Sequence, residues 1–395
     1  MTAPRELDAQ GGLESVTATG RVDSLTGIRA VAALLVVLTH AAYTTGKYPQ
    51  GYVGLVYSRM EIGVPIFFVL SGFLLFASWV KAVASERPPP SVRRYAWHRV
   101  RRIMPAYAVT VIAAYLLYHF RTAGPNPGHT WEGLFRNLTL TQIYTDDYLF
   151  SYLHQGLTQM WSLAVEVAFY AVLPLLAYLL LVLLCRRQWR PRLLLAGLAG
   201  LTMVSPAWLI LVHTTDFLPD GSRLWLPGYL AWFVGGMVLA ALQPLGLRAY
   251  ALACIPLAMV SYLIVATPIA GEPTTSPAEL REALFKVAFY TVIATLLVAP
   301  LALCGPGVVG GKRPGPAGGN RQGLYIRMMG SRPMVFLGEI SYEIFLIHLI
   351  IMELVMVEIL RYPIYTGSAW LLFSGTLVVT IPLAWLLHRF TRVRS

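Results

Sequence analysis

Ten apolar stretches of about twenty residues recur along this chain of 395 residues, and each is long enough to cross a bilayer as a helix. Apolar residues make up 56% of the chain and charged residues 13%, so a soluble fold would leave large apolar patches facing water. We therefore expect an all-α integral membrane protein with about ten transmembrane helices. The expected spans are residues 26–45, 62–80, 103–120, 162–184, 193–213, 225–243, 249–268, 283–304, 335–359 and 369–388.

The basic side chains indicate how these spans are oriented. The chain carries 31 Lys and Arg against 19 Asp and Glu. No basic run is interleaved with aromatic residues in a polar segment, so we expect no nucleic-acid partner. With the N-terminus inside, most Lys and Arg fall in cytoplasmic segments, as the positive-inside rule requires. We predict a multi-pass protein of the plasma membrane, surrounded by the lipid bilayer, with both termini in the cytoplasm.

The polar segments divide the chain into one membrane domain with two short tails. The first segment has no apolar run of the kind found in a signal peptide. We expect cytoplasmic tails at 1–23 and 391–395. The expected domain covers 24–390 and includes a basic cytoplasmic loop at 81–102, an aromatic outer segment at 121–160 that roofs the spans, and a flexible Gly/Pro-rich cytoplasmic loop at 305–333.

The three cysteines indicate no metal or redox chemistry. Cys185, Cys254 and Cys304 lie far apart in apolar stretches, so they form neither a disulfide framework nor a zinc site. We interpret them as small hydrophobic side chains and predict no metal.

Ionisable residues inside apolar spans are costly and are therefore candidates for function. Arg29 and His40 are eleven residues apart in the first span, so they share one helix face about 16 Å apart along the axis. Glu166 lies early in the fourth span at an expected depth like that of His40, where a carboxylate can fix an imidazole tautomer. Structural roles stay open: a snorkelling arginine, a histidine bonded to a carbonyl, or a glutamate packed against another span.

Two further arginines are expected at the depth of Arg29. Arg99 and Arg102 stand where the basic loop enters the third span. Three arginines at one cytoplasmic depth favour a phosphate-bearing ligand. The alternative is a loop that only sets topology or binds anionic lipid.

The ninth and second spans supply the remaining polar candidates. Ser341 and His348 are seven residues apart and share a helix face, so some of this set can line one cavity. In the second span, we expect Gly72 to let two helices approach closely.

Taken together, these segments resemble the acyltransferase-3 family of polytopic membrane O-acyltransferases. The resemblance covers about residues 22–390, and it departs from the family at His98, where a further basic residue often precedes the arginine pair. The matching residues are Arg29-x10-His40, Phe67-Phe68-Val69-Leu70-Ser71-Gly72-Phe73, Arg99-x-x-Arg102-x-x-Pro105-x-Tyr107, Trp161-Ser162-Leu163-x-x-Glu166-x-x-Phe169-Tyr170 and Leu337-Gly338-x-x-Ser341-Tyr342-x-x-Phe345-Leu346-x-His348.

The resemblance implies transfer of an acyl group, often acetyl, from cytoplasmic acyl-CoA to a hydroxyl of a sugar or glycolipid. It implies that His40 is essential and that Arg29, Arg99 and Arg102 bind the acyl-CoA. We expect His40 to act as general base, oriented by Glu166, without a metal. An acyl-histidine intermediate stays open. Residues expected to donate to the oxyanion or contact substrate are Ser71, Ser341, Tyr342 and His348.

The acceptor and the class of protein leave alternatives. Arg greatly outnumbers Lys, and the residues Ala, Gly and Pro are abundant. This composition is typical of a GC-rich genome, such as that of an actinobacterium. The resemblance implies two acceptor classes in such organisms, envelope glycolipids, trehalose mycolates among them, and macrolide antibiotics. We expect a cell-envelope glycolipid, such as a trehalose mycolate. A transporter or lipid flippase without acyl chemistry is the main alternative. A further one is a non-catalytic partner of an envelope-assembly complex. An envelope-assembly or lipid-export protein is also an expected partner of the chain.

Overall fold

Helices account for every regular element among the residues that the computed structural model describes, which are 8–121, 125–146, 148–273, 279–304 and 319–392. Parts of both expected tails and of the expected loop 305–333 lie outside these ranges. The α-helices are α1 (Asp8–Thr44), α2 (Gly51–Ser58), α3 (Gly63–Ala84), α4 (Val92–Phe120), α5 (Trp131–Leu138), α6 (Met160–Ala177), α7 (Pro191–Thr202), α8 (Val204–Thr214), α9 (Leu226–Leu242), α10 (Ala251–Val265), α11 (Leu280–Ala302), α12 (Gly319–Met329), α13 (Arg332–Glu339), α14 (Ser341–Leu354) and α15 (Ala369–Thr391).

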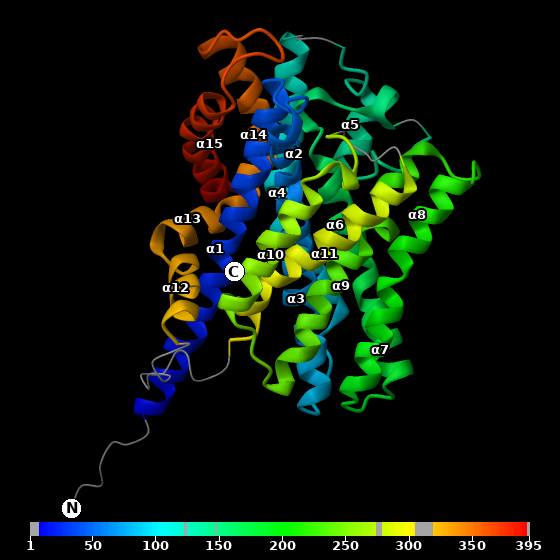
Figure 1. Cartoon of the computed structure of the whole chain (residues 1–395), viewed down its shortest axis with the longest axis vertical. Coiled ribbons are helices and arrows are strands. Elements are labelled where there is room, and N and C mark those ends of the chain that lie inside the picture. The colour runs from blue at the N-terminus through cyan, green and yellow to red at the C-terminus, as the bar shows by residue number, and fades with distance from the viewer. Residues whose placement is uncertain (1–7, 122–124, 147, 274–278, 305–318, 393–395) are drawn as a thin grey trace, which may run out of the picture.

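The long helices stand side by side in one bundle (Figure 1). The short helices α2 and α5 lie at one end, called here the α5 end, and α1 begins at the opposite end, called here the α1 end. Among the described residues, eight helical segments are long and apolar enough to cross a membrane, and they match eight of the ten expected spans. The prediction of an all-helical protein with many spans is confirmed.

The other two expected spans take different forms. The stretch at 335–359 is a pair of helices bent by 69°, in which α13 is followed by α14 and its π-helical extension η8 (Val355–Ile359). The stretch at 249–268 forms α10, which has only 15 residues. Apolar length alone therefore does not distinguish a straight span from a bent or a short one.

The basic loop expected at 81–102 is corrected by the structure. α3 continues to Ala84, and α4 begins at Val92 because the Ser91 side chain caps the new helix. The three prolines before Ser91 cannot continue α3. The basic residues consequently lie on the first turns of a 29-residue helix rather than in a loop.

The expected flexible loop at 305–333 is corrected in its second part, which forms α12 and the start of α13. α13 packs directly on α1. A Cβ atom at Gly338 would come within 2.0 Å of the carbonyl oxygen of Thr26, so only glycine permits this contact. The bent pair therefore begins against the same helix that carries Arg29.

Glycines bring the backbones of α3 and α9 into direct contact. A Cβ atom at Gly72 would stand 2.0 Å from the carbonyl oxygen of Phe233, and one at Gly236 would stand 1.9 Å from that of Val69. Small residues at a crossing allow such an approach within a membrane. The prediction that Gly72 serves close helix packing is confirmed.

This contact can be tested by adding one methyl group. We expect Gly72→Ala to lower stability by about 1–3 kcal/mol, because the methyl group meets backbone that cannot move aside. Gly200→Ala on α7 is the matched control, since nothing lies within 4 Å of that Cβ position. Thermal unfolding followed by tryptophan fluorescence in nanodiscs measures both, and equal Tm values for the two variants would contradict the close contact.

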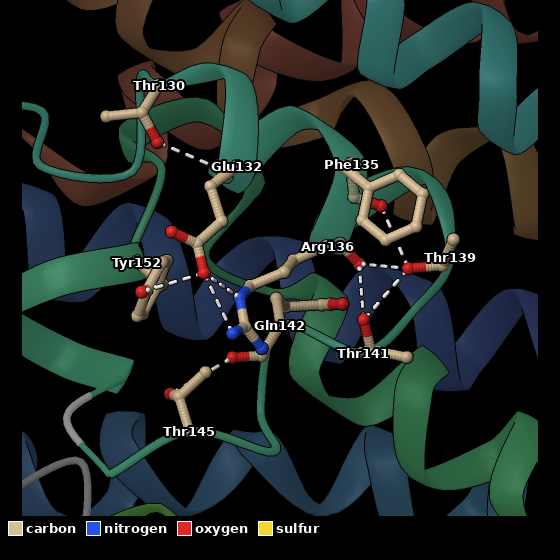
Figure 2. Close-up of polar contacts among 10 residues, drawn as sticks. Thr130, Glu132, Phe135, Arg136, Thr139, Thr141, Gln142, Thr145 and Tyr152 are labelled. Carbon is tan, nitrogen blue, oxygen red and sulfur yellow. Dashed lines mark hydrogen bonds and ion pairs between the residues drawn. The ribbon is translucent and has the colours of Figure 1, made fainter.

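The segment expected to roof the spans, 121–160, folds into short helical turns at the α5 end (Figure 1). Figure 2 shows its central contacts, in which Glu132 accepts hydrogen bonds from Arg136 Nε at 2.8 Å and from the Tyr152 hydroxyl at 3.0 Å. The guanidinium of Arg136 also lies over the Tyr152 ring, 4.8 Å from its centre. These two hydrogen bonds, of which the one from Arg136 has the larger effect, hold the pKa of Glu132 below its usual value.

The roof is fixed to the long helices at two points, one in α5 and one just before α6. In α4, the Tyr107 hydroxyl donates to the carbonyl oxygen of Asn137 at 2.6 Å. Just before α6, the amide of Gln159 donates to the carbonyl oxygen of Leu346 at 2.9 Å. Because Leu346 lies in the middle of α14, the roof descends into the bundle before α6 begins.

A buried histidine also fastens the roof to α4. His154 is only 2% exposed, packs on the Tyr115 ring, and accepts a hydrogen bond from the Asn126 amide at 3.4 Å. His129 Nδ1 lies 3.3 Å from the same nitrogen of His154. Burial, and secondarily the neighbouring His129, lowers the pKa of His154 to about 3. The folded protein therefore holds this ring neutral.

A pH dependence of stability follows. An unfolded histidine titrates near 6.5, so between about pH 6.5 and pH 3 the unfolded state binds more protons at His154 than the folded state does. The contribution of His154 to stability is complete above about pH 6.5 and is lost as the pH falls. We expect His154→Phe, which keeps a ring, to flatten the decline of Tm between pH 7.5 and pH 5. His119→Phe, at an exposed ring, serves as control, and parallel wild-type and His154→Phe curves would refute this role.

Candidate active site

A cavity of about 190 Å³ lies between α1, α3, α4, α6 and α14. It brings together polar residues that are up to 313 positions apart in the chain, from Arg29 to Tyr342. Phe67 and Phe345 form part of its apolar wall. Its polar lining consists of Arg29, Ser71, Arg99, Arg102, Ser162, Glu166, Tyr170 and Tyr342.

Three arginines, called here the cavity arginines, supply the positive charge of the cavity. Arg29 comes from α1, and Arg99 and Arg102 come from successive turns on one side of α4. The Nε atom of Arg99 is buried and has no hydrogen-bond partner among the described residues. None of the three forms an ion pair within the described part of the chain. A buried guanidinium nitrogen without a partner, such as Nε of Arg99, is costly, so this arrangement is suited to an anionic ligand.

Glu166 is the acidic residue of the cavity lining. Its Oε1 atom accepts a hydrogen bond from the Tyr170 hydroxyl at 2.5 Å and another from the Ser71 hydroxyl. Tyr170 lies one turn further along α6, so the two side chains share a face. The carboxylate is also close enough to Arg29 for their opposite charges to attract. Glu166 therefore offsets part of the arginine charge and holds the Ser71 hydroxyl in place.

The expected pairing of Glu166 with His40 is corrected by these contacts. The expected depth of Glu166 assumes that the fourth span begins at the outer surface. Gln159 shows instead that α6 begins level with Leu346, inside the bundle. Glu166 lies seven residues beyond Gln159, about 10 Å deeper toward the α1 end. It consequently reaches the level of the cavity arginines and not that of His40.

His40 instead forms a dyad with His348 of α14. The Nδ1 atom of His40 lies 2.9 Å from the Nε2 atom of His348, and their ring centres are 5.1 Å apart. His348 is completely buried, whereas His40 is partly exposed. The two rings, called here the histidine dyad, join helices that are far apart in the sequence.

Backbone carbonyl groups fix which nitrogen atoms of the dyad carry hydrogen. Nδ1 of His348 lies 2.8 Å from the carbonyl oxygen of Phe345 and 3.1 Å from that of Ile344. Because carbonyl oxygens only accept, this nitrogen must be the donor. Burial favours the neutral ring, so Nε2 of His348 is an acceptor. His40 then donates from Nδ1, which leaves the lone pair on its Nε2 atom available to take up a proton.

Neither histidine of the dyad lines the cavity, but the dyad adjoins one of its wall residues. Tyr342, Phe345 and His348 follow one another at three-residue intervals along α14, so they form one ladder on its surface. The first two line the cavity, and the ring centres of Phe345 and His348 are 6.0 Å apart. The site therefore has two levels, with the cavity arginines and Glu166 on one and the histidine dyad on the other.

The hydroxyl groups expected as oxyanion donors are already engaged. Ser341 donates to the carbonyl oxygen of Gly338 at 2.8 Å, and it is not among the cavity-lining residues. Tyr342 lines the cavity but donates to the carbonyl oxygen of Ile103 at 3.0 Å. Ser71 donates to Glu166. In this structure all three hydroxyl groups donate to other groups of the protein, and their role as oxyanion donors stays a prediction.

Two contributions were not foreseen from the sequence. Tyr170 had no assigned role, although its place four residues after Glu166 was a usable signal. His348 was expected at the substrate and instead contacts His40, a partner 308 positions away that no local pattern reveals. Among the described residues, no group of three or more His, Cys, Asp or Glu is placed to hold a metal ion.

Comparisons with known proteins identify the family. Residues 22–389 match the family model of the acyltransferase-3 domain. The chain is 28% identical over 348 residues to the acyltransferase MdmB of Streptomyces mycarofaciens, which covers 84% of this chain and 79% of that protein. It is 29% identical over 222 residues to the peptidoglycan O-acetyltransferase OatA of Listeria monocytogenes, covering 52% of this chain and 31% of that protein. No solved structure matches at a significant level.

Both relatives are named as acyltransferases, so the transporter and flippase alternative is set aside. The helical spans agree with a membrane location.

Proposed function

The chain belongs to the acyltransferase-3 family of membrane acyltransferases, and from this premise we propose that it transfers an acyl group, acetyl in the simplest case, from acyl-CoA to a hydroxyl of a sugar-containing acceptor. The observation that carries the proposal is the two-level site. The level of the cavity arginines suits a phosphate-bearing donor, and the level of the histidine dyad offers a neutral imidazole with a free lone pair.

The cavity arginines are the proposed binding site for the phosphates of CoA. Guanidinium groups match phosphate oxygens in charge and geometry, and the unpartnered Nε of Arg99 gains a partner when a phosphate enters. In the proposed orientation this level faces the cytoplasm, where acyl-CoA is made. The extended arm of CoA would then run along Phe345 and bring the thioester to the dyad.

His40 is the proposed general base. Its Nε2 atom takes the proton of the acceptor hydroxyl while the hydroxyl oxygen attacks the thioester carbonyl carbon. A C–O bond forms, the C–S bond breaks, and the proton passes from His40 to the departing CoA thiolate. His348 accepts from Nδ1 of His40 throughout and so holds the ring in the reactive tautomer. A covalent acyl-histidine is the alternative course, and trapping of labelled protein distinguishes the two.

The proposed acceptor is a cell-envelope glycolipid, with a trehalose mycolate as the specific example. The relative OatA is named for peptidoglycan, itself a sugar-containing envelope polymer, and MdmB comes from a Streptomyces species. A membrane-borne acceptor can reach a site within the bundle without leaving the bilayer. Incubating membranes with labelled acetyl-CoA and identifying the labelled product tests this part directly.

The donor level is tested by CoA binding. We expect Arg99→Ala or Arg102→Ala to raise the Kd of CoA roughly 10- to 100-fold, since a charge-assisted hydrogen bond contributes about 1.5–3 kcal/mol. Glu166→Gln removes a negative charge beside Arg29 and should tighten CoA binding, by about 5-fold. Calorimetry on protein in nanodiscs measures all three values.

Arg101→Ala is the matched control for that series. Arg101 lies on the same turns of α4 and carries the same charge, but its guanidinium stands over the Trp97 ring and does not line the cavity. We expect its Kd to stay within twofold of the wild type. If Arg99, Arg101 and Arg102 variants weaken CoA equally, the effect is general charge and the cavity is not the donor site.

Separate variants of His40 and His348 test the proposed general base and its hydrogen-bond partner. His40→Ala should lower kcat by about 10²–10⁴-fold, the usual contribution of a general base. His348→Ala should lower it by about 10–100-fold, because the tautomer of His40 is no longer fixed. His348→Gln can place an amide oxygen where Nε2 stood and should recover part of that loss. CoA affinity should be unchanged in all three, and full activity of correctly folded His348→Ala would remove His348 from the mechanism.

A further inference from the structure

Two exposed tyrosines stand together at the α5 end of α1. The side chains of Tyr43 and Tyr365 are 43% and 57% exposed, yet their rings meet edge to face with centres 5.9 Å apart. Their hydroxyl oxygens are 3.4 Å apart. The Tyr48 ring packs against the Tyr43 ring with centres 5.4 Å apart, and the hydroxyl groups of Tyr48 and Thr39 are hydrogen-bonded at 2.7 Å. We call Tyr43 and Tyr365 the tyrosine platform.

The backbone holds the platform in an unfavourable conformation. Tyr365 has φ of +61°, a left-handed value that a bulky aromatic residue rarely adopts. Its N–H donates to the carbonyl oxygen of Thr44 at 3.1 Å. Gly46 faces Tyr365, and this position must be glycine because a Cβ atom there would stand 2.4 Å from the carbonyl oxygen of Tyr365. Strain of this kind, kept by the surrounding structure, is concentrated at ligand-binding and active sites.

The platform lies one helical turn beyond the histidine dyad. Tyr43 follows His40 by three residues, so both are on one face of α1, and helical side chains lean back over the preceding turn. Contacts between α1 and α14 continue at this level, where the Thr44 hydroxyl lies 3.8 Å from the sulfur of Met352. His348 of the dyad is one turn before Met352 on α14. The site thus continues from the cavity, through the dyad, to exposed aromatic rings.

We propose that the tyrosine platform binds the sugar ring of the acceptor and presents one of its hydroxyls to Nε2 of His40. The inference rests on the proposed function and adds the place and mode of acceptor binding. Aromatic faces pack on the apolar C–H faces of a sugar, and tyrosine hydroxyls bond its oxygens. The platform itself is uncharged, so it fits a neutral sugar better than an anionic one.

The experiment measures acceptor KM with a sugar probe and a matched probe that has no sugar. The probes are octanoyltrehalose and monooctanoylglycerol, which share a chain and differ in the head group. Protein in nanodiscs is given acetyl-CoA, and released thiol is followed. Tyr365→Asn is the main variant, because asparagine tolerates a left-handed backbone, so the ring is removed while strain is relieved.

We expect Tyr365→Asn to raise KM for octanoyltrehalose about 10-fold without loss of Tm, with kcat and the Kd of CoA within twofold of wild type. Tyr365→Phe should stay within about threefold of wild type. Tyr52→Leu, at another exposed tyrosine of the α5 end, is the control for a general interfacial role and should leave KM unchanged.

The outcomes separate the two levels of inference. A wild type that releases no thiol with either probe, or with any membrane extract, refutes the proposed function itself. A wild type that acts on octanoyltrehalose together with an unchanged KM in Tyr365→Asn overturns only the platform. Equal increases in KM for Tyr52→Leu and Tyr365→Asn also overturn it, in favour of simple membrane anchoring. Preference of the wild type for monooctanoylglycerol overturns the sugar assignment.

Discussion

The free-energy cost of burying charge inside a helix bundle governs the polar interior of this protein. Most buried charges are compensated within the chain. Arg59 is 1% exposed and donates to three backbone carbonyl oxygens around the end of α10, and Lys286 is paired with Glu61 at 2.6 Å. The cavity arginines are less buried than these, and Arg102 is exposed, but the buried Nε atom of Arg99 has no hydrogen-bond partner among the described residues. This unpartnered nitrogen and the cavity beside it distinguish the ligand site from structural charge.

The tautomers of the histidine dyad depend on hydrogen bonds to backbone carbonyl groups. The carbonyl oxygens of Ile344 and Phe345 lie beside Nδ1 of His348 and can only accept, so this nitrogen donates. Each later step follows from that bond, since it makes Nε2 of His348 an acceptor and Nδ1 of His40 a donor. The tautomer of the proposed base is thus set by main-chain geometry, which a change of side chain at a distance does not disturb. Glu166 is then free to serve the cavity.

The sequence predicted the helical fold better than the depth at which individual side chains lie. Hydropathy identified the spans because apolar length is a direct requirement of the bilayer. It could not show that α4 starts at Val92, since that depends on the Ser91 cap and not on apolar length. It also misplaced Glu166, because the descent of the roof through Gln159 is a tertiary contact. The pairing of His40 with His348 was likewise beyond any local pattern.

The two levels of the site also solve an electrostatic problem. A histidine that takes up a proton becomes positive, and three arginines that share one carboxylate would oppose that charge if they lay beside it. Placing them on the far side of Phe345 reduces this repulsion, and a bound phosphate donor would neutralise them further. Under the proposed function, the positive charge that His40 gains in the reaction is therefore opposed less when the donor is bound than when the cavity is empty. Proton removal from the acceptor is thereby favoured when a thioester is present to receive the attack.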